Sequence, residues 1–172
     1  MTINKKWDLT GVHGLNKFLW DKLKTELEWS ASNYGGLIPI VPAGQQPELN
    51  DYSAPYIVYN YSHQSPGDDF FIQEEQVAYA IYSSNEADIR RCINVIIEYL
   101  KRVDESAKMI NDFIHTNGTE ENKRFDYKYV RIISTFGAQP PISEGGRMDG
   151  SVILRIAYTY YDPTTGKERL VI

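Results

Sequence analysis

The side chains best suited to chemistry are few and are scattered along the chain. His13, His63 and His115 fall at an expected helix start, in a polar loop and at an expected helix end. None of them has a second histidine or a cysteine at the spacing of zinc ligands. The sequence therefore predicts no metal site and no cofactor.

Asp68 and Asp69 form the most conspicuous acidic pair, directly after Pro66-Gly67. Two carboxylates could bind calcium or share acid–base work, but adjacent aspartates in such a loop more often form a solvated turn. Gly166-Lys167 matches only the end of a phosphate-binding loop, because the upstream glycine and the following serine or threonine are missing.

Nucleophilic chemistry finds no support in the sequence either. No serine lies in a G-x-S-x-G pattern, and the single cysteine, Cys92, falls within a helical pattern without a neighbouring base. We therefore predict that the protein is not an enzyme. An enzyme whose carboxylates are distant in sequence stays open as an alternative, and a deep pocket holding two carboxylates with separated pKa values would reveal it.

Length and charge restrict the function further. The 172 residues fit one domain, 1–172, with residues 1–12 as an N-terminal arm. The formal net charge of −5 makes the chain a poor nucleic-acid binder, because it has little to gain from counterion release. No apolar run approaches the roughly 20 residues of a membrane span, and the first residues do not resemble a secretory signal, so we expect a soluble protein without a membrane partner.

An amphipathic helix is expected to begin near His13. Its apolar side chains recur at helical spacing and give one apolar face, formed by Leu15, Phe18, Leu19, Leu23 and Leu27. Trp20 and Trp29 fall partly off this stripe and could widen the core face or contact a partner. The Pro-rich stretch 37–55 excludes a helix or a central strand, and we interpret it as a contact loop.

Strand patterns and a second helical region follow. Strands are predicted at Tyr56–Tyr61, Phe71–Tyr82, Phe125–Phe136, Ser151–Tyr161 and Glu168–Ile172. The first half of the second strand, Gln73 to Gln76, is expected to be solvated. Asn85 is expected to cap a helix reaching Leu100 and beyond, a shorter helix is expected at Glu105–His115, and Gly137–Arg147 is expected to hold no regular element.

This order of elements predicts the fold class. It reads α-β-β-α-β-β-β, which favours an α+β fold: a mostly antiparallel sheet of four to five strands with an N-terminal helix and a central helix, or helix pair, packed on one face. The 13 tyrosines suit both half-buried sheets and interfaces, so their number alone does not separate packing from partner contact.

The layout over residues 13–162 resembles the bacteriophage tail terminator proteins. The residues that carry the resemblance are Ala54-Pro55-Tyr56-Ile57-Val58-Tyr59, Val77 to Tyr82 leading into the helix Asp88–Leu100, and the late strand Ser151–Tyr161. The resemblance implies a structural virion protein, assembled in the host cytoplasm, whose subunits form a hexameric ring. That ring caps the tail tube, stops its polymerisation and offers a docking surface to the head-side neck connector. Its partners would be other copies, the tube protein and a sheath protein in tails that have one, while DNA passes through without specific binding.

Ten residues are candidate contacts with neighbouring subunits or partners. They are Trp20, Trp29, Tyr56, Tyr59, Tyr61, Asp68, Asp69, Pro140, Pro141 and Arg147. The loops at 64–70 and 137–150 are expected to reach neighbouring rings. Other head-closure or tail-completion connectors, and a non-viral module that binds proteins through a sheet edge, stay open as alternative functions.

Overall fold

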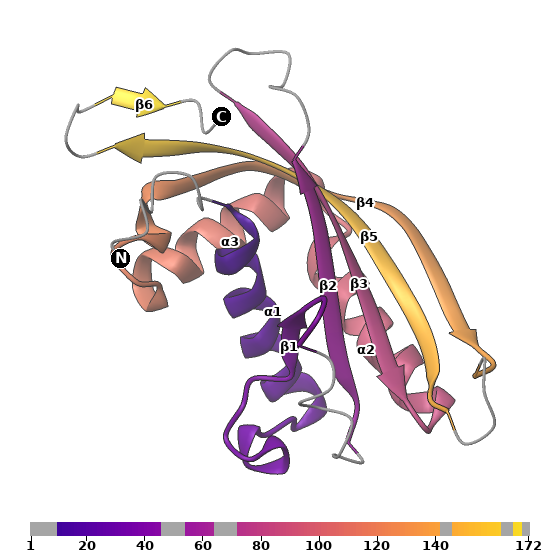
Figure 1. The fold of residues 1–172 in the computed structure, drawn as a ribbon. Helices are drawn as coiled ribbons and strands as arrows, with labels where there is room; N and C mark the ends of the chain where they lie inside the picture. The colour runs from indigo at the N-terminus through magenta and orange to yellow at the C-terminus, as the bar shows by residue number, and fades with distance from the viewer. Residues whose placement is uncertain (1–9, 46–53, 64–71, 142–145, 163–166, 170–172) are drawn as a thin grey trace.

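A twisted sheet with three helices on one side organises the chain (Figure 1). The computed structural model describes residues 10–45, 54–63, 72–141, 146–162 and 167–169. Its elements are α1 (Val12–Leu27), η2 (Ala31–Tyr34), β1 (Ile40–Pro42), β2 (Tyr56–His63), β3 (Gln73–Ser83), α2 (Glu86–Leu100), α3 (Val103–Asn117), η4 (Asn122–Arg124), β4 (Phe125–Gln139), β5 (Met148–Asp162) and β6 (Lys167–Arg169). The predicted α+β class and the central helix pair are confirmed.

The strands form one mixed sheet in the order β1-β2-β3-β5-β4, and β6 pairs with β5. All pairs are antiparallel except β1 with β2. The strand β1 was not expected, because the prolines of 37–55 indicated a loop. It is compatible with Pro42 because the proline ends a three-residue strand at the sheet edge, where a missing N–H disturbs little pairing.

The segment after β4 also differs from the prediction. Gly137–Arg147 was expected to hold no regular element, but β4 continues to Gln139, and its partner β5 begins at Met148. Residue Gln139 pairs with Asp149, so the hairpin is longer than the glycine and proline content indicated. The tertiary pairing of the two long strands overrides the local signal.

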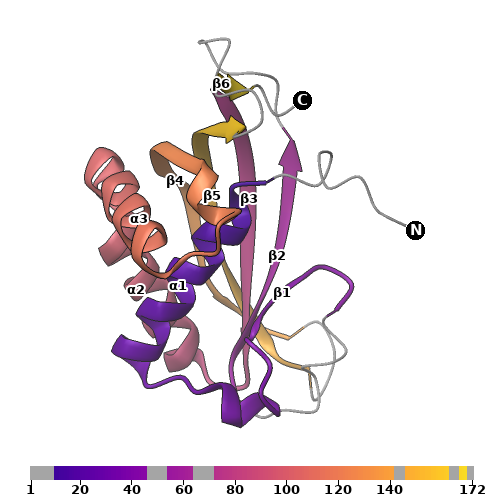
Figure 2. The same cartoon turned by 90° about the vertical axis from the view of Figure 1, so that its left-hand side faces the viewer.

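Side-chain alternation divides the sheet into a covered and an uncovered face. Figure 2 shows α1, α2 and α3 on the same side of the sheet. On that side Val77, Tyr79 and Ile81 of β3 are fully buried, whereas the alternate residues Ala78 and Ala80 face the other way and are only half-buried. The main core therefore lies between the sheet and the helices.

The start of α1 packs closely on the sheet because two glycines lie there. A Cβ at Gly11 would come within 2.7 Å of the Tyr158 ring, and a Cβ at Gly14 within 2.6 Å of the Tyr127 hydroxyl. The Tyr127 hydroxyl donates a hydrogen bond to the Gly11 carbonyl oxygen. These contacts fix where α1 crosses β4 and β5.

The first half of β3 was expected to be solvated, and Glu75 shows that this expectation is wrong. Its side chain is fully buried on the covered face. The Thr10 hydroxyl donates to Oε2 at 2.7 Å, and the Tyr158 hydroxyl donates to Oε1 at 2.7 Å. A buried carboxylate is tolerated when such donors replace its water. Strand alternation, rather than local polarity, decides which of Gln73 to Gln76 is buried.

Asn85 caps α2 as expected. Its side-chain oxygen accepts a hydrogen bond from the Ala87 N–H at 2.9 Å. The buried residues of α2 follow the predicted stripe, with Ile89, Ile93 and Ile96 against the sheet. Cap and stripe together orient α2 so that its polar side faces solvent.

Candidate subunit and partner interface

Three of the candidate contact residues are buried inside their own chain. Trp20 is 9% exposed, Tyr56 1% and Tyr59 6%. Tyr59 packs between Tyr61 and Tyr79, with ring centroids 6.5 Å and 6.3 Å away. The expectation that Trp20, Tyr56 and Tyr59 contact partners is therefore corrected: these rings pack the core of the subunit.

Arg147 also has an intramolecular role. Its Nη1 donates a hydrogen bond to the Ala54 carbonyl oxygen at 2.9 Å, and its guanidinium carbon lies 5.0 Å from the centre of the Tyr56 ring. Tyr56 stacks in turn on Tyr82, with centroids 5.3 Å apart. Arg147 thereby holds the segment before β5 against the start of β2, and its side chain stays half-exposed.

The other candidates keep more surface or lie outside the described residues. Tyr61 is 42% exposed, Trp29 is half-buried, and Pro140 and Pro141 are exposed just beyond the end of β4. Asp68 and Asp69, with the whole loop 64–70, lie outside the described residues.

A cavity of about 490 Å³ lies at the start of α1, between Thr10, His13 and Lys17 on one side and the α3–β4 connection on the other. Burial lowers the pKa of His13, while Glu121 acts in the opposite direction. Glu121 is the one carboxylate lining this cavity, so the separated carboxylate pair that would mark an acid–base enzyme is not found there. Within the described part of the chain, no three His, Cys, Asp or Glu side chains are close enough to hold a metal ion.

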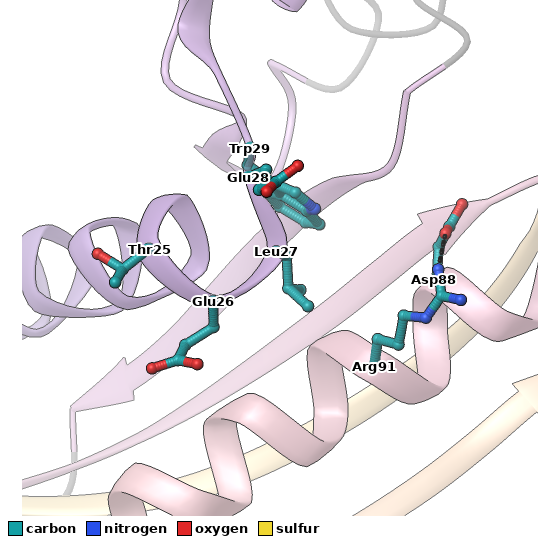
Figure 3. A pocket seen from close by; sticks show the side chains of 7 residues that line it. All are labelled: Thr25, Glu26, Leu27, Glu28, Trp29, Asp88 and Arg91. Atoms are coloured by element: carbon teal, nitrogen blue, oxygen red, sulfur yellow. Dashed lines mark ion pairs between the residues drawn. The ribbon is translucent and has the colours of Figure 1, made fainter.

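A second depression, the α1–α2 groove, is acidic with an apolar wall. It measures about 310 Å³ and is lined by Thr25, Glu26, Leu27, Glu28, Trp29, Asp88 and Arg91 (Figure 3). Arg91 forms an ion pair with Asp88 at 3.7 Å. Glu26 accepts a hydrogen bond from the Tyr99 hydroxyl, which, as the largest of several causes, raises the pKa of Tyr99 to about 12. The groove is thus lined by Glu26 and Glu28 at the end of α1 and by the Asp88–Arg91 pair on α2.

Glu28 occupies an unusual backbone position in this groove. It follows the last residue of α1 with φ of 56°, and it is the one non-glycine residue of the described chain with a positive φ. Glycine is the usual residue in this left-handed position. The Glu28 side chain is exposed and has no ion pair or hydrogen bond with any described residue.

A cationic and apolar patch lies along the β4 edge of the sheet, mostly on the uncovered face. We call it the β4 patch and define it as Tyr129, Arg131, Ile133, Phe136 and Arg155. Leu154 and Ile156 are buried under the helices, so Arg155 between them points to the uncovered face, directly opposite Arg131 in the register. Ile133 is 44% and Phe136 53% exposed.

Two exposed apolar side chains lie at the opposite edge of the sheet. We call them the β1 patch: Leu37 and Ile38, which lie just before β1 and are 41% and 49% exposed. Tyr61, 42% exposed, lies in the part of β2 beyond the other end of β1. Because β1 and β4 are the two outer strands, the β1 patch and the β4 patch lie at opposite edges.

The edge of β4 is protected along only part of its length. The Asn111 side chain of α3 accepts from the Tyr127 N–H at 2.8 Å and donates to the Tyr127 carbonyl oxygen at 3.0 Å. It thereby takes the place of a neighbouring strand at Tyr127. Further along, residues 129–139 pair with β5 on one side and with no strand of the described chain on the other.

Sequence reasoning missed the β4 patch, whereas Leu37 and Ile38 fall within the predicted contact loop 37–55 but were not singled out. Ile132 and Ile133 are consecutive apolar residues in a strand, and the pairing register shifts between Ile132 and Ser134. That break in apolar–polar alternation was the available signal for an exposed Ile133.

Comparison with known proteins does not assign the chain to a family. No protein-family model matches it. No curated protein matches it either. Among the described residues, no helix is long and apolar enough to cross a membrane.

Proposed function

We propose that this protein is a structural subunit that assembles with copies of itself into a ring of the phage tail terminator type. In this role the ring caps the tail tube, stops the addition of tube subunits and receives the head-side connector. The proposal joins the layout over residues 13–162 to one observation, the pair of unlike apolar patches at opposite edges of the sheet.

Unlike surfaces at opposite edges favour head-to-tail association. A two-fold dimer needs one self-complementary surface, whereas a repeated contact between two different surfaces closes into a ring when the rotation per subunit allows it. The β1 patch and the β4 patch differ in their residues and in their strands. Covering either patch with a different surface of a neighbouring copy removes exposed apolar area from water on both partners.

The charge of the subunit suits a ring around a passage for DNA. The formal net charge is −5, so the wall of such a passage would not grip the phosphate backbone through counterion release. Termination then needs no chemistry: one end of the ring reproduces the contact that a tube subunit would make, and the other end offers a different surface.

Light scattering coupled to gel filtration, followed by negative-stain images with isolated tail tubes, tests this function. We expect concentration-dependent oligomers and rings at tube ends. Ile38→Asp and Ile133→Asp should each weaken association, whereas Met109→Asp, which alters an exposed apolar residue on α3, should not. A chain that stays monomeric at every concentration and never binds a tube end would refute the proposal.

A second candidate is a non-viral module that binds another protein by adding a strand to β4. The open edge at residues 129–139 favours it, because an extended segment can pair with such an edge. Affinity capture from the source cell, together with the identity of neighbouring genes, separates the two. Portal, tube and sheath genes nearby favour the virion role, or that of another neck connector.

A further inference from the structure

Arg131 and Arg155 form a pair of like charges that the described chain does not neutralise. They are directly opposite each other on β4 and β5, on the face that no described helix covers. Like charges in this cross-strand position destabilise a sheet. Neither guanidinium has an ion pair with any described residue. The arrangement therefore lowers the stability of the isolated subunit.

The surroundings of the pair leave it short of acceptors. The Nε of Arg155 is shielded from solvent and has no hydrogen-bond partner in the described structure. Glu74, an acid on the same face, already accepts a hydrogen bond from the Tyr129 hydroxyl at 2.7 Å, and the Arg131 guanidinium lies 5.2 Å from the centre of the Tyr129 ring. A guanidinium partly withdrawn from water without an acceptor is costly, so an incoming anion would relieve the cost.

The chemistry of the patch selects a single carboxylate over a nucleic-acid backbone. Two adjacent guanidinium groups match the planar, forked geometry of a carboxylate. A polyanion would also have to pass Glu74, Asp126 and Asp149, which point to the same face, and would approach a chain of net charge −5.

The chain itself contains a carboxylate that matches this site. The α1–α2 groove holds Glu28, exposed and without an ion pair in the described structure, beside the apolar Leu27 and Trp29. The groove is formed by the helix layer, whereas the β4 patch lies on the uncovered face of the sheet. A contact between them is therefore a contact between two unlike surfaces of two copies.

We propose that Arg131 and Arg155 of one copy bind the Glu28 carboxylate of a second copy, with Phe136 packing against the apolar wall of that copy's α1–α2 groove. This inference rests on the proposed function, since it names the polar part of the head-to-tail contact. It also accounts for the retention of glutamate where glycine would suit the backbone better.

Sedimentation velocity on the full chain tests the pairing through a charge swap. Arg131→Glu and Glu28→Arg should each weaken self-association by about tenfold or more, as expected for opposed charges in an interface. The double variant, carrying both changes in one chain, should restore association to within about threefold of the wild type, because the reversed charges attract again. Lys108→Glu on α3 makes the same charge change as Arg131→Glu at an exposed site and should leave association unchanged.

Glu28→Gly separates a binding role from a folding role. Glycine relieves the left-handed backbone at position 28, so the melting temperature should stay the same or rise. Association should nevertheless fall as it does for Glu28→Arg. A structural role for Glu28 predicts the opposite, a lower melting temperature with unchanged association.

Each outcome separates this inference from the proposed function. If the wild type forms rings and none of the single variants weakens them, or if the double variant fails to restore association, the Arg–Glu28 pairing is overturned and the ring function stands. If Arg131→Glu abolishes only binding to duplex DNA in a filter assay, a nucleic acid is the occupant and the inference is also overturned. If the wild-type protein remains monomeric at all concentrations, both the Arg–Glu28 pairing and the ring function are refuted.

Discussion

Tyr158→Phe should measurably destabilise the protein although it removes a single oxygen atom. The Tyr158 ring is fully buried and packs edge-on against Phe125, with centroids 5.2 Å apart. Phenylalanine keeps these ring contacts. What it loses is the hydrogen bond from the hydroxyl to Oε1 of Glu75, at 2.7 Å. The change therefore isolates the polar link between β5 and the buried carboxylate.

The expected magnitude follows from the type of acceptor. A hydrogen bond to a charged group contributes about 1.5–3 kcal/mol, more than one between neutral groups. For a chain of this size, about 1 kcal/mol corresponds to about 2–4 °C in melting temperature, so the loss should be roughly 3–12 °C. Urea titration followed by circular dichroism gives the free energy of unfolding directly.

Tyr160→Phe is the matched control. Tyr160 lies on the same strand and the same face, and it is 6% exposed. Its hydroxyl accepts a longer bond of 3.3 Å from the guanidinium of Arg124, beyond the usual hydrogen-bond range, so its removal should cost less than removal of the 2.7 Å bond from Tyr158 to Glu75. If both variants lose the same free energy of unfolding, the hydrogen bond to Glu75 contributes no more than the one to Arg124, and the reasoning is refuted.

Thr10→Val extends the test to the other oxygen of Glu75. The Thr10 hydroxyl donates to Oε2 and also accepts from the Val12 N–H at 3.1 Å, so it links the start of α1 to β3. Because both hydroxyls serve one carboxylate, the double variant with Tyr158→Phe should deviate from additivity by about 0.5 kcal/mol or more. Strict additivity would show that the two donors act independently.

Three further changes test separate features of the fold. Asn111→Ala should cost about 1–3 kcal/mol, because it leaves both backbone groups of Tyr127 without their side-chain partner, and it should increase aggregation in light scattering by opening the β4 edge; an unchanged urea midpoint would count against this. Gly14→Ala should lower the free energy of unfolding by about 1–3 kcal/mol, and with it the melting temperature, because the added Cβ would lie 2.6 Å from the Tyr127 hydroxyl. Helix propensity alone predicts the opposite, a higher melting temperature. Burial raises the pKa of Tyr79, Tyr127 and Tyr158 well above the ordinary value of about 10, so the folded state keeps these protons where the unfolded state loses them. Stability should therefore be complete below about pH 10 and fall above it by roughly 4 kcal/mol per pH unit for the three together, and urea unfolding that is unchanged between pH 9 and 11.5 would contradict this.

Local patterns in the sequence were sufficient for most of the elements. The stripe from Leu15 to Leu27 and the cap at Asn85 predict helices because helical spacing and capping depend on residues only a few positions apart. The alternation of Val77, Tyr79 and Ile81 predicts a strand for the same reason. The α+β class follows from these signals together, and so does the order of the elements apart from β1, which was not expected.

The candidate interface was much less accessible to sequence reasoning. Aromatic residues were selected as contacts because tyrosine and tryptophan are common at interfaces, but Trp20, Tyr56 and Tyr59 pack the subunit's own core. An aromatic side chain gains as much from burial in its own core as from burial against a partner. Its type alone therefore cannot tell which of the two occurs.

The sequence by itself determined the helices and most of the strands, because those preferences arise between near neighbours, whereas β1 and the end of β4 depended on tertiary pairing. The tertiary structure alone decided that Glu75 is buried between Thr10 and Tyr158, and that Arg131 lies opposite Arg155. Such pairs depend on strand order and register. These are set by how the whole sheet packs under three helices, and a slip of one residue would turn each of these side chains to the other face.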